Sequence, residues 1–452
     1  MKNKEMLGTE PIGKLLFKLS VPTVLAQLIN MLYNVVDRIF IGRMPGEGDL
    51  ALTGVGVCMP IIMLVSAFAA LVSSGGAPRA SIFIGKRDME SAERILGGCL
   101  ALQAVISFAL TALILIFNRP LLLAFGASEN TIEYASSYLS VYAFGTLFVQ
   151  LTLGMTAFVS AQGFTKVSMI SVSIGALSNI ILDAIFIYAL DLGVRGAALA
   201  TVISQGITTA FLISFLLGGR AFLKLKRGYI RLSPAVLLPC VGLGVATFVM
   251  QASESVISVA FNSSLYKHGG DIAVGAMTIL ASVMQFAMLP LQGFAQGSQP
   301  ILSYNYGARN KERVVATFKL LLICCLGYSF LLWGSVMLFP RGFAALFTDK
   351  AELIDFTSRV IRIYFGGMLL FGIQTACQMT FVSLGNAPSS VLVAVVRKFV
   401  LLLPLIYIMP LLVADKTLGI YIAEPIADVV AVTFTAILFA FQFRKSIRKI
   451  GE

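Results

Sequence analysis

The chain has 452 residues, of which 58% are hydrophobic and only 12% are charged. A typical soluble domain carries about 25% charged residues, so this composition excludes a water-soluble globular protein. The net charge of +12 would suggest a nucleic-acid partner in a soluble chain, but here the basic residues lie in the connections between apolar segments. We therefore expect lipid around the protein and no nucleic acid.

Apolar runs of the roughly 20 residues that cross a bilayer as a helix recur along the whole chain. We predict an all-α integral membrane protein with twelve transmembrane helices in two pseudo-symmetric six-helix bundles. The expected spans are residues 15–36, 52–76, 93–117, 131–156, 165–190 and 196–217, followed by 236–262, 272–296, 314–339, 356–381, 391–413 and 418–441.

Most of the 34 Lys and Arg residues fall on one side of this arrangement, which includes the amino-terminal segment, the basic connector 220–231 and the carboxyl-terminal segment. Cytoplasmic connections carry the excess of basic residues in membrane proteins. The distribution predicts a multi-pass protein of the cell membrane with both termini in the cytoplasm, in contact with membrane lipids.

The second half of the chain repeats the first. A shift of 222 residues superposes Asp49 on Asp271, Gly75 on Gly297, Pro78 on Pro300, Arg87 on Arg309, and Gly163 on Gly385. We predict an amino-terminal lobe at 1–217, a basic cytoplasmic connector at 218–234 and a carboxy-terminal lobe at 235–452. Because six spans return the chain to its starting side, an axis along the membrane normal should relate the lobes, and rocking one lobe against the other would give alternating access.

Motifs of pumps and enzymes are absent from the sequence. It has no GxxxxGK[ST] phosphate loop, no HExxH and no His and Cys cluster at metal-binding spacing, and its six cysteines fall in predicted spans without a CxxC pair. We expect neither an ATP-driven pump nor an enzyme, no cofactor, and no metal other than sodium.

Polar side chains recur at helical spacing on one face of the first span, at Gln27, Asn30, Asn34 and Asp37. The seventh span repeats the first three positions of this pattern with Gln251, Glu254 and Ser258. Neither face can point at lipid, so we expect Gln27, Asn30, Asn34 and Glu254 to line a substrate cavity between the lobes.

Four oxygen-bearing side chains of the first lobe lie near the outer ends of their spans: Asp37, Asn179, Asp183 and Thr201. A charge at the bilayer centre costs about 2.5 to 3.5 kcal/mol on insertion scales, which makes an intramembrane acid a functional candidate. Hard monovalent cations prefer oxygen ligands. We predict that these four residues form a cation-coupling site for sodium or a proton. The alternative is that Asp37 is an interfacial residue neutralised by Arg38.

Charged residues of the second lobe suggest ion pairs between helices. Glu254 of the seventh span is expected to face Arg397 or Lys398 of the eleventh, while Glu424 and Asp428 share one face of the twelfth. Unpaired charges there would be costly. The pattern leaves open whether this charge network is structural or takes part in transport.

Glutamines are also spaced for single helix faces, at Gln285, Gln292, Gln296 and Gln299 of the eighth span and at Gln374 and Gln378 of the tenth. We expect Gln285, Gln292, Gln374 and Gln378 to line the substrate cavity. The alternative is that they hydrogen-bond neighbouring helices.

Several motifs together resemble the multidrug and toxin extrusion (MATE) family. They are Tyr33-Asn-Val-Val-Asp37-Arg-Ile-Phe-Ile-Gly42, Asn179-Ile-Ile-Leu-Asp183, Gly193-Val-Arg-Gly-Ala-Ala-Leu-Ala-Thr201, and Pro300 with Tyr304-Asn-Tyr-Gly-Ala308. The resemblance implies two bundles around a V-shaped cavity, a monomer, and export of amphipathic, often cationic small molecules in exchange for sodium or protons.

The same resemblance implies a coupling site at Asp37, Asn179, Asp183 and Thr201, which match the family's Asp, Asn, Asp and Thr positions. Other family members use acids in the seventh and tenth helices. Glu254 approximates the first of these, but residues 361–381 contain no acid. This departure favours coupling in the first lobe.

Two other functions remain open at this point. A lipid-linked saccharide flippase would share the cavity between two bundles but should line it with Arg and Lys for the pyrophosphate. A membrane receptor or scaffold would share the span pattern and transport nothing.

Overall fold

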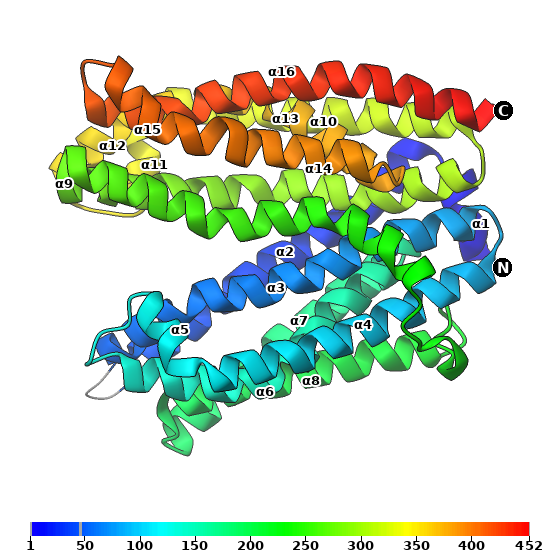
Figure 1. Cartoon of the computed structure of the whole chain (residues 1–452), viewed down its shortest axis with the longest axis horizontal. Helices are drawn as coiled ribbons and strands as arrows, with labels where there is room; N and C mark the ends of the chain where they lie inside the picture. The colour runs from blue at the N-terminus through cyan, green and yellow to red at the C-terminus, as the bar shows by residue number, and fades with distance from the viewer. Residues whose placement is uncertain (1, 45–47, 452) are drawn as a thin grey trace.

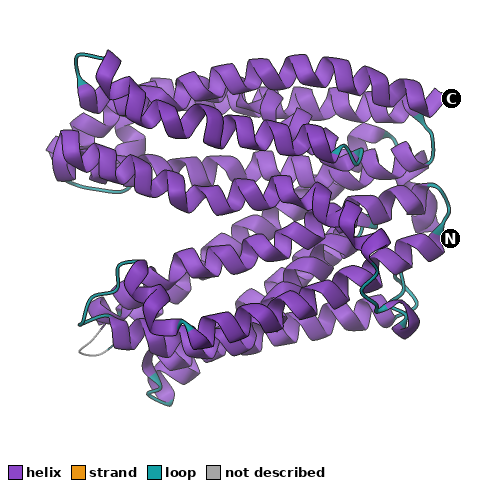
Figure 2. Cartoon of the chain, in the orientation of Figure 1, coloured by secondary structure: helices purple, strands orange, loops and turns teal. Residues whose placement is uncertain are grey.

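The computed structural model describes residues 2–44 and 48–451. Within these ranges it consists of helices joined by short loops, with no strand (Figure 2). Eleven helices are long and apolar enough to cross a membrane, and α9 counts as two spans because it is broken at Gly270. The prediction of an all-α membrane protein with twelve spans is confirmed.

The first half of the chain forms six of these helices and two short ones. Their bounds are α1 (Lys2–Thr9), α2 (Ile12–Gly42), α3 (Gly48–Gly85), α4 (Met89–Ile116), α5 (Asn118–Ala124), α6 (Ile132–Ala161), α7 (Thr165–Asp183), the π-helical η1 (Ala184–Ala189), α8 (Gly193–Leu217) and the 3-10 turn η2 (Arg227–Tyr229).

The second half has the same plan with more interruptions. Its elements are α9 (Pro234–Gly307), α10 (Lys311–Leu338), α11 (Pro340–Ala345), α12 (Ala351–Tyr364), the 3-10 turn η3 (Phe365–Gly367), α13 (Met368–Ser383), α14 (Ala387–Val395), the π-helical η4 (Val396–Leu402), α15 (Leu403–Leu412) and α16 (Lys416–Gly451).

The helices form two groups, α2 to α8 and α9 to α16, which lie close together at the end that holds both termini and separate toward the other end (Figure 1). At the close end α3 and α9 cross at two glycines. A Cβ atom on Gly85 would lie 2.0 Å from the Tyr304 carbonyl oxygen, and one on Gly307 would lie 1.9 Å from that of Ile82. Only glycine permits this approach, so the crossing fixes where the lobes meet.

The turn in the middle of α9 differs from the prediction. We expected a loop between residues 262 and 272, but helix continues on both sides of Gly270, whose φ of 62° is accessible mainly to glycine. Hydrogen bonds from Thr417 Oγ1 to the His268 carbonyl (2.9 Å) and from Tyr421 Oη to the Ala273 carbonyl (2.6 Å) hold the turn against α16. The polar composition of this segment is typical of a loop, but the chain reverses direction at the single residue Gly270.

The basic connector is attached to the first lobe. Gln162 Oε1 accepts hydrogen bonds from the backbone N–H groups of Phe222 (2.8 Å) and Leu223 (2.9 Å). Lys226 forms an ion pair of 2.5 Å with Glu93, and this hydrogen bond raises the pKa of Lys226. The connector is therefore an ordered part of the structure.

The internal repeat is visible in the backbone as well as in the sequence. Arg87 and Arg309, which coincide in the repeat, both have positive φ, of 64° and 58°. The next residue in each half caps a helix: Asp88 accepts from the Ser91 N–H and Asn310 from the Arg313 N–H. The two lobes thus share local geometry where their side chains differ.

Candidate functional site

The four oxygen-bearing side chains of the first lobe lie close together. Asp37 is on α2, Asn179 and Asp183 are on α7, and Thr201 is on α8. Asn179 Nδ2 donates to Thr201 Oγ1 across 3.5 Å, a long hydrogen bond. The side chains of Asp37 and Asp183 are close enough to interact electrostatically. The fold therefore brings all four predicted residues into one cluster.

The cluster contains buried acceptor oxygens without donors. Asp37 Oδ1, Asn179 Oδ1 and both carboxylate oxygens of Asp183 have no hydrogen-bond partner among the described residues. Unpaired buried polar groups are costly, and two ionised carboxylates this close repel each other. A proton shared between the acids, or a small cation bound by the oxygens, would relieve both costs.

The alternative for Asp37, neutralisation by Arg38, finds no support in the geometry. Asp37 is buried while Arg38, the next residue on the helix, is exposed. Among the described residues no ion pair joins the two side chains. The acid points into the lobe and the base away from it.

Two tyrosines near the cluster were missed by the sequence analysis. Tyr33 of α2 lies near both Asp37 and Asp183, and the buried Tyr138 of α6 lies beside Thr201 and Asp37. Tyr138 also stacks on Tyr142, with ring centroids 6.3 Å apart. The four-residue spacing of the tyrosines in α6 was the available signal.

The backbone changes at the cluster. Asp183 is the last residue of α7, and the π-helical η1 follows at once. Insertions of this kind into α-helices are frequent at functional sites. The position of Asp183 therefore coincides with a local widening of its helix.

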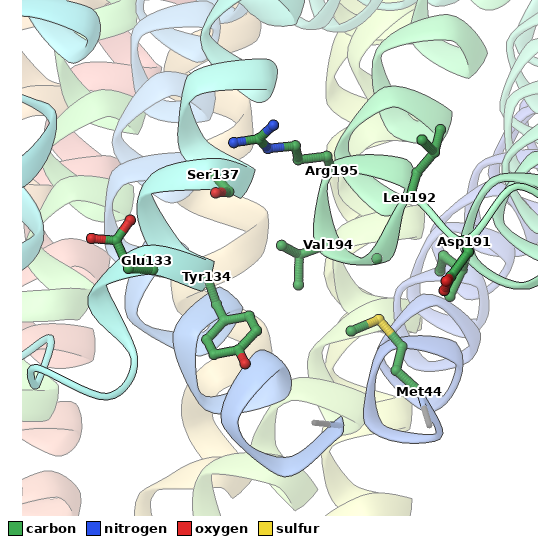
Figure 3. A pocket seen from close by; sticks show the side chains of 10 residues that line it. Met44, Glu133, Tyr134, Ser137, Asp191, Leu192, Val194 and Arg195 are labelled. Atoms are coloured by element: carbon green, nitrogen blue, oxygen red, sulfur yellow. The ribbon is translucent and has the colours of Figure 1, made fainter. Parts of the chain in front are cut away.

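A cavity of about 460 Å³ is lined by residues of α6, η1 and α8 (Figure 3). It lies one to two helical turns beyond the cluster. Ile187 follows Asp183 by four residues, and Val194 precedes Thr201 by seven. The cavity is lined by Met44, Glu133, Tyr134, Ser137, Ile187, Asp191, Leu192, Gly193, Val194 and Arg195. The sequence analysis did not identify it, since its residues come from the ends of four elements.

The polar stripe of α2 is divided between the lobes. Gln27 Nε2 donates to Gln296 Oε1 of α9 across 3.3 Å, so this side chain joins the two lobes. Asn30 and Asn34 are exposed, and Asn34 Nδ2 donates to the Asn30 carbonyl at 2.7 Å. Only the middle of the stripe, Asn30 and Asn34, is thus free to contact a solute.

In the second lobe the structure assembles a buried ion-pair network. Arg397 contacts Asp428 at 2.8 Å and Glu424 at 3.3 Å, and its guanidinium lies 4.6 Å from the centre of the Phe371 ring. All three charged residues are buried. One base thus serves two acids.

A second pair joins α9 to the same region. Lys398 Nζ lies 2.7 Å from Glu254 Oε1, with the Lys398 side chain 6% exposed and the Glu254 side chain 58% exposed. Both bases lie in η4, the π-helical segment of this lobe. The five predicted charges of the second lobe therefore form two sets of ion pairs built on adjacent bases, and Glu254 is their accessible member.

The four glutamines expected to line the cavity differ in exposure and in their hydrogen bonds. Gln285 and Gln292 are exposed. Gln374 is buried, and Gln378 Nε2 donates to Ser390 Oγ (2.8 Å) of α14. The first pair is available to a solute, whereas Gln378 bonds a neighbouring helix.

Comparison with known proteins places the chain in context. The MatE family model matches residues 22–185 and 245–408, one segment in each lobe. The multidrug export protein MepA of Staphylococcus haemolyticus is 24% identical over 411 residues, and that of Staphylococcus aureus (strain NCTC 8325) is 23% identical over 412 residues, each with 90% of both chains covered.

Solved structures share the fold of this chain. The crystal structure of MATE in the bent conformation superposes with a TM-score of 0.93 at 23% identity, covering 100% of both chains. The outward-facing conformation of a multidrug resistance MATE family transporter superposes with a TM-score of 0.90 at 24% identity, covering 100% of this chain and 99% of that one. The matches to the family model span most of both lobes, and the chain accordingly belongs to the MATE family of membrane transporters, which are not enzymes.

Proposed function

We propose that this protein is a cation-coupled antiporter that exports amphipathic, cationic small molecules by alternating access. Relatives named multidrug export proteins, which match 90% of the chain, support the export of varied compounds. The observation that carries cation coupling is the pair Asp37 and Asp183, buried side by side with unpaired oxygens.

Either sodium or a proton satisfies this pair. A proton would be shared between the two carboxyl groups, while sodium would take oxygen ligands from Asp37, Asn179, Asp183 and Thr201. Binding neutralises the repulsion between the acids, so the loaded and empty clusters differ in free energy. That difference is what an ion gradient needs in order to shift a two-state transporter.

The driving force is sufficient for accumulation. One elementary charge moving through 100 mV releases about 2.3 kcal/mol, which corresponds to a concentration ratio of roughly fiftyfold at one ion per substrate. No cofactor is needed for this exchange.

The moving units are the two lobes. Residues 1–217 and 235–452 rock about the crossing of α3 and α9, and the connector 218–234 links them on the cytoplasmic side. The excess of basic residues at the end that holds both termini supports a cytoplasmic location for that end. We take the working unit to be a monomer in the cell membrane, surrounded by lipid.

We assign the substrate surface to exposed polar residues outside the crossing of α3 and α9. Asn30, Asn34, Gln285 and Gln292 are exposed, and Glu254 offers the accessible carboxylate. An amphipathic cation suits such a surface because amide oxygens accept hydrogen bonds and the Glu254 carboxylate has a second oxygen besides the one that Lys398 contacts. We leave Gln374 and Gln378 out of this proposed surface, because Gln374 is buried and Gln378 donates to Ser390.

The flippase alternative requires basic side chains that are free to bind a pyrophosphate. The intramembrane bases Arg397 and Lys398 are instead occupied by Asp428, Glu424 and Glu254. This occupation favours cationic over anionic cargo.

The experiment is uptake of ethidium into everted membrane vesicles under separately imposed sodium and pH gradients. One gradient should drive uptake by the wild type and thereby identify the coupling ion. Uptake under neither gradient would contradict the antiporter and direct attention to lipid-linked saccharides; purified protein in liposomes that moves no solute at all would favour a receptor or scaffold.

A further inference from the structure

A second, smaller cavity of about 140 Å³ lies at the end of the molecule that holds the termini. It is enclosed by the start of the chain, the turn between α6 and α7, and the connector. Its lining consists of Met6, Lys18, Leu19, Gln162, Gly163, Phe164, Thr165, Lys166, Val167 and Phe222. Drug-sized ligands occupy about 300 to 1,000 Å³, so this cavity suits a smaller group.

The first turn of α7 presents backbone donors to this cavity. Phe164 at the amino-terminal cap has no side-chain acceptor, and the N–H groups of Val167 (2.9 Å) and Ser168 (3.2 Å) bond back to its carbonyl. In the part of the chain that is described, this leaves the N–H groups of Thr165 and Lys166 as the free donors of the turn. Free donors and the helix dipole together favour an anion at such a terminus.

The Thr165 side chain is an independent sign of a ligand. The residue is 2% exposed, and Oγ1 has no hydrogen-bond partner among the described residues. By contrast, both polar atoms of the neighbouring Gln162 side chain have partners, since Oε1 accepts from Phe222 and Leu223 and Nε2 donates to the Phe158 carbonyl. An unpaired buried hydroxyl costs about 1 to 3 kcal/mol, which a ligand oxygen would recover.

The charged side chains that line the cavity also favour an anion. Lys166 lines it and is exposed. Lys18 also lines it, but its Nζ is held by Glu10 at 3.0 Å, so that charge is balanced. The excess is positive, as in the basic pockets at helix ends that bind lipid phosphate groups.

We propose that this cavity binds a phosphate oxyanion, carried either by a membrane lipid headgroup or by a soluble phosphate ester. The Thr165 hydroxyl, the N–H groups of Thr165 and Lys166, and the Lys166 ammonium are its ligands. The site is separate from the acidic cluster of the first lobe and does not depend on cation coupling.

The position of the site links it to the junction between the lobes. The same amino-terminal segment that supplies Met6 and Lys18 contacts the second lobe, where Asn305 Nδ2 donates to the Leu7 carbonyl (2.9 Å) and Arg313 Nη2 to the Glu10 carbonyl (2.8 Å). A phosphate bound between this segment and α7 therefore stabilises the closed end of the molecule.

Thermal unfolding of the full-length protein tests the proposal. In detergent, inorganic phosphate is titrated against chloride at equal ionic strength; in lipid nanodiscs, phosphatidylglycerol is compared with phosphatidylcholine. The wild type should gain thermal stability from at least one phosphate source. Thr165→Val combined with Lys166→Gln should raise the phosphate concentration for half-maximal stabilisation at least tenfold, or abolish the lipid-dependent shift in the thermal midpoint.

Thr357→Val is the matched control, because Thr357 of α12 is also buried with an unpaired hydroxyl but does not line this cavity. It should respond to phosphate and lipid as the wild type does. If the double variant does not fold, Lys166→Gln alone, at an exposed position, gives the same comparison. A response to phosphate alone supports a soluble ester, and a response to phosphatidylglycerol alone supports a headgroup. No response in the wild type, or equal responses in wild type and variants, overturns the site.

Discussion

The buried acids of the two lobes differ in whether they have a basic partner. In the first lobe Asp37 and Asp183 have unpaired oxygens and no ion pair among the described residues, whereas in the second lobe Arg397 contacts both Glu424 and Asp428. A buried acid with a basic partner is already neutralised, while a buried pair without one needs a proton or cation from solution. We therefore propose that the first lobe couples the ion and that the charges of the second lobe hold its helices together.

The contrast is sharper because the backbones are related. Each lobe has a π-helical segment following the helix that begins at equivalent positions, Thr165 and Ala387, 222 residues apart. In the first lobe the segment follows an acid, Asp183, and in the second it carries two bases, Arg397 and Lys398. The π-helical segments begin 19 and 9 residues after these starts, so the two lobes share where the helix begins and differ in where it widens.

The largest effect is expected from removing the unpaired acids. Asp37→Asn and Asp183→Asn should each abolish gradient-driven ethidium uptake while leaving thermal stability unchanged or higher, because each removes a buried charge that has no basic partner. Asp349→Asn, at an exposed position between α11 and α12 that lines neither cavity, is the control and should retain uptake. Full uptake by both cluster variants would end the assignment.

Removing Arg397, the base of the second lobe, should instead lower the stability of the protein. Arg397→Met leaves two buried acids unpaired and should destabilise the protein by about 3 to 5 kcal/mol, measured as a lower thermal midpoint in detergent. Combining it with Glu424→Gln and Asp428→Asn should restore most of that stability. If the restored triple variant folds but exports nothing, the network takes part in transport and the contrast between lobes is wrong.

The pair Glu254 and Lys398 should respond asymmetrically. Lys398 is buried and Glu254 is largely exposed, so Glu254→Gln strands a buried ammonium, whereas Lys398→Met leaves only an accessible carboxylate. The fall in thermal midpoint should be at least twice as large for Glu254→Gln. Equal falls would show that Glu254 is as desolvated as its partner.

The smallest effect is expected at Thr201. Thr201→Val removes one oxygen from the cluster and the 3.5 Å contact with Asn179 Nδ2, at about 0.5 to 1.5 kcal/mol. The cation concentration for half-maximal uptake should rise roughly 2- to 10-fold, with the maximal rate retained. Thr201→Ser keeps the oxygen and should behave as the wild type; a shift in Thr201→Ser alone would point to packing instead of ion binding.

Much of the candidate site was predictable from helical spacing. Asn179 and Asp183 lie one turn apart on α7, and Asp37 ends the polar stripe of α2, so their shared depth in the membrane followed from span positions. The pairing of Gln378 with Ser390 was not predictable, since the same spacing serves a cavity wall or a helix contact equally well. Tyr138 was missed because a tyrosine in an apolar span looks like packing until its neighbours are known.

The sequence by itself determined the number of spans, their membrane environment and the duplication, because hydrophobic length and repeated residues are properties of the chain alone. Only the tertiary structure decided which acids have partners: Arg397 meets Asp428 across 31 positions and Lys398 meets Glu254 across 144, while Asp37 and Asp183 meet each other. The partner of a buried acid depends on which helix faces pack together. The sequence shows the acid itself but does not show whether a base or another acid lies opposite it.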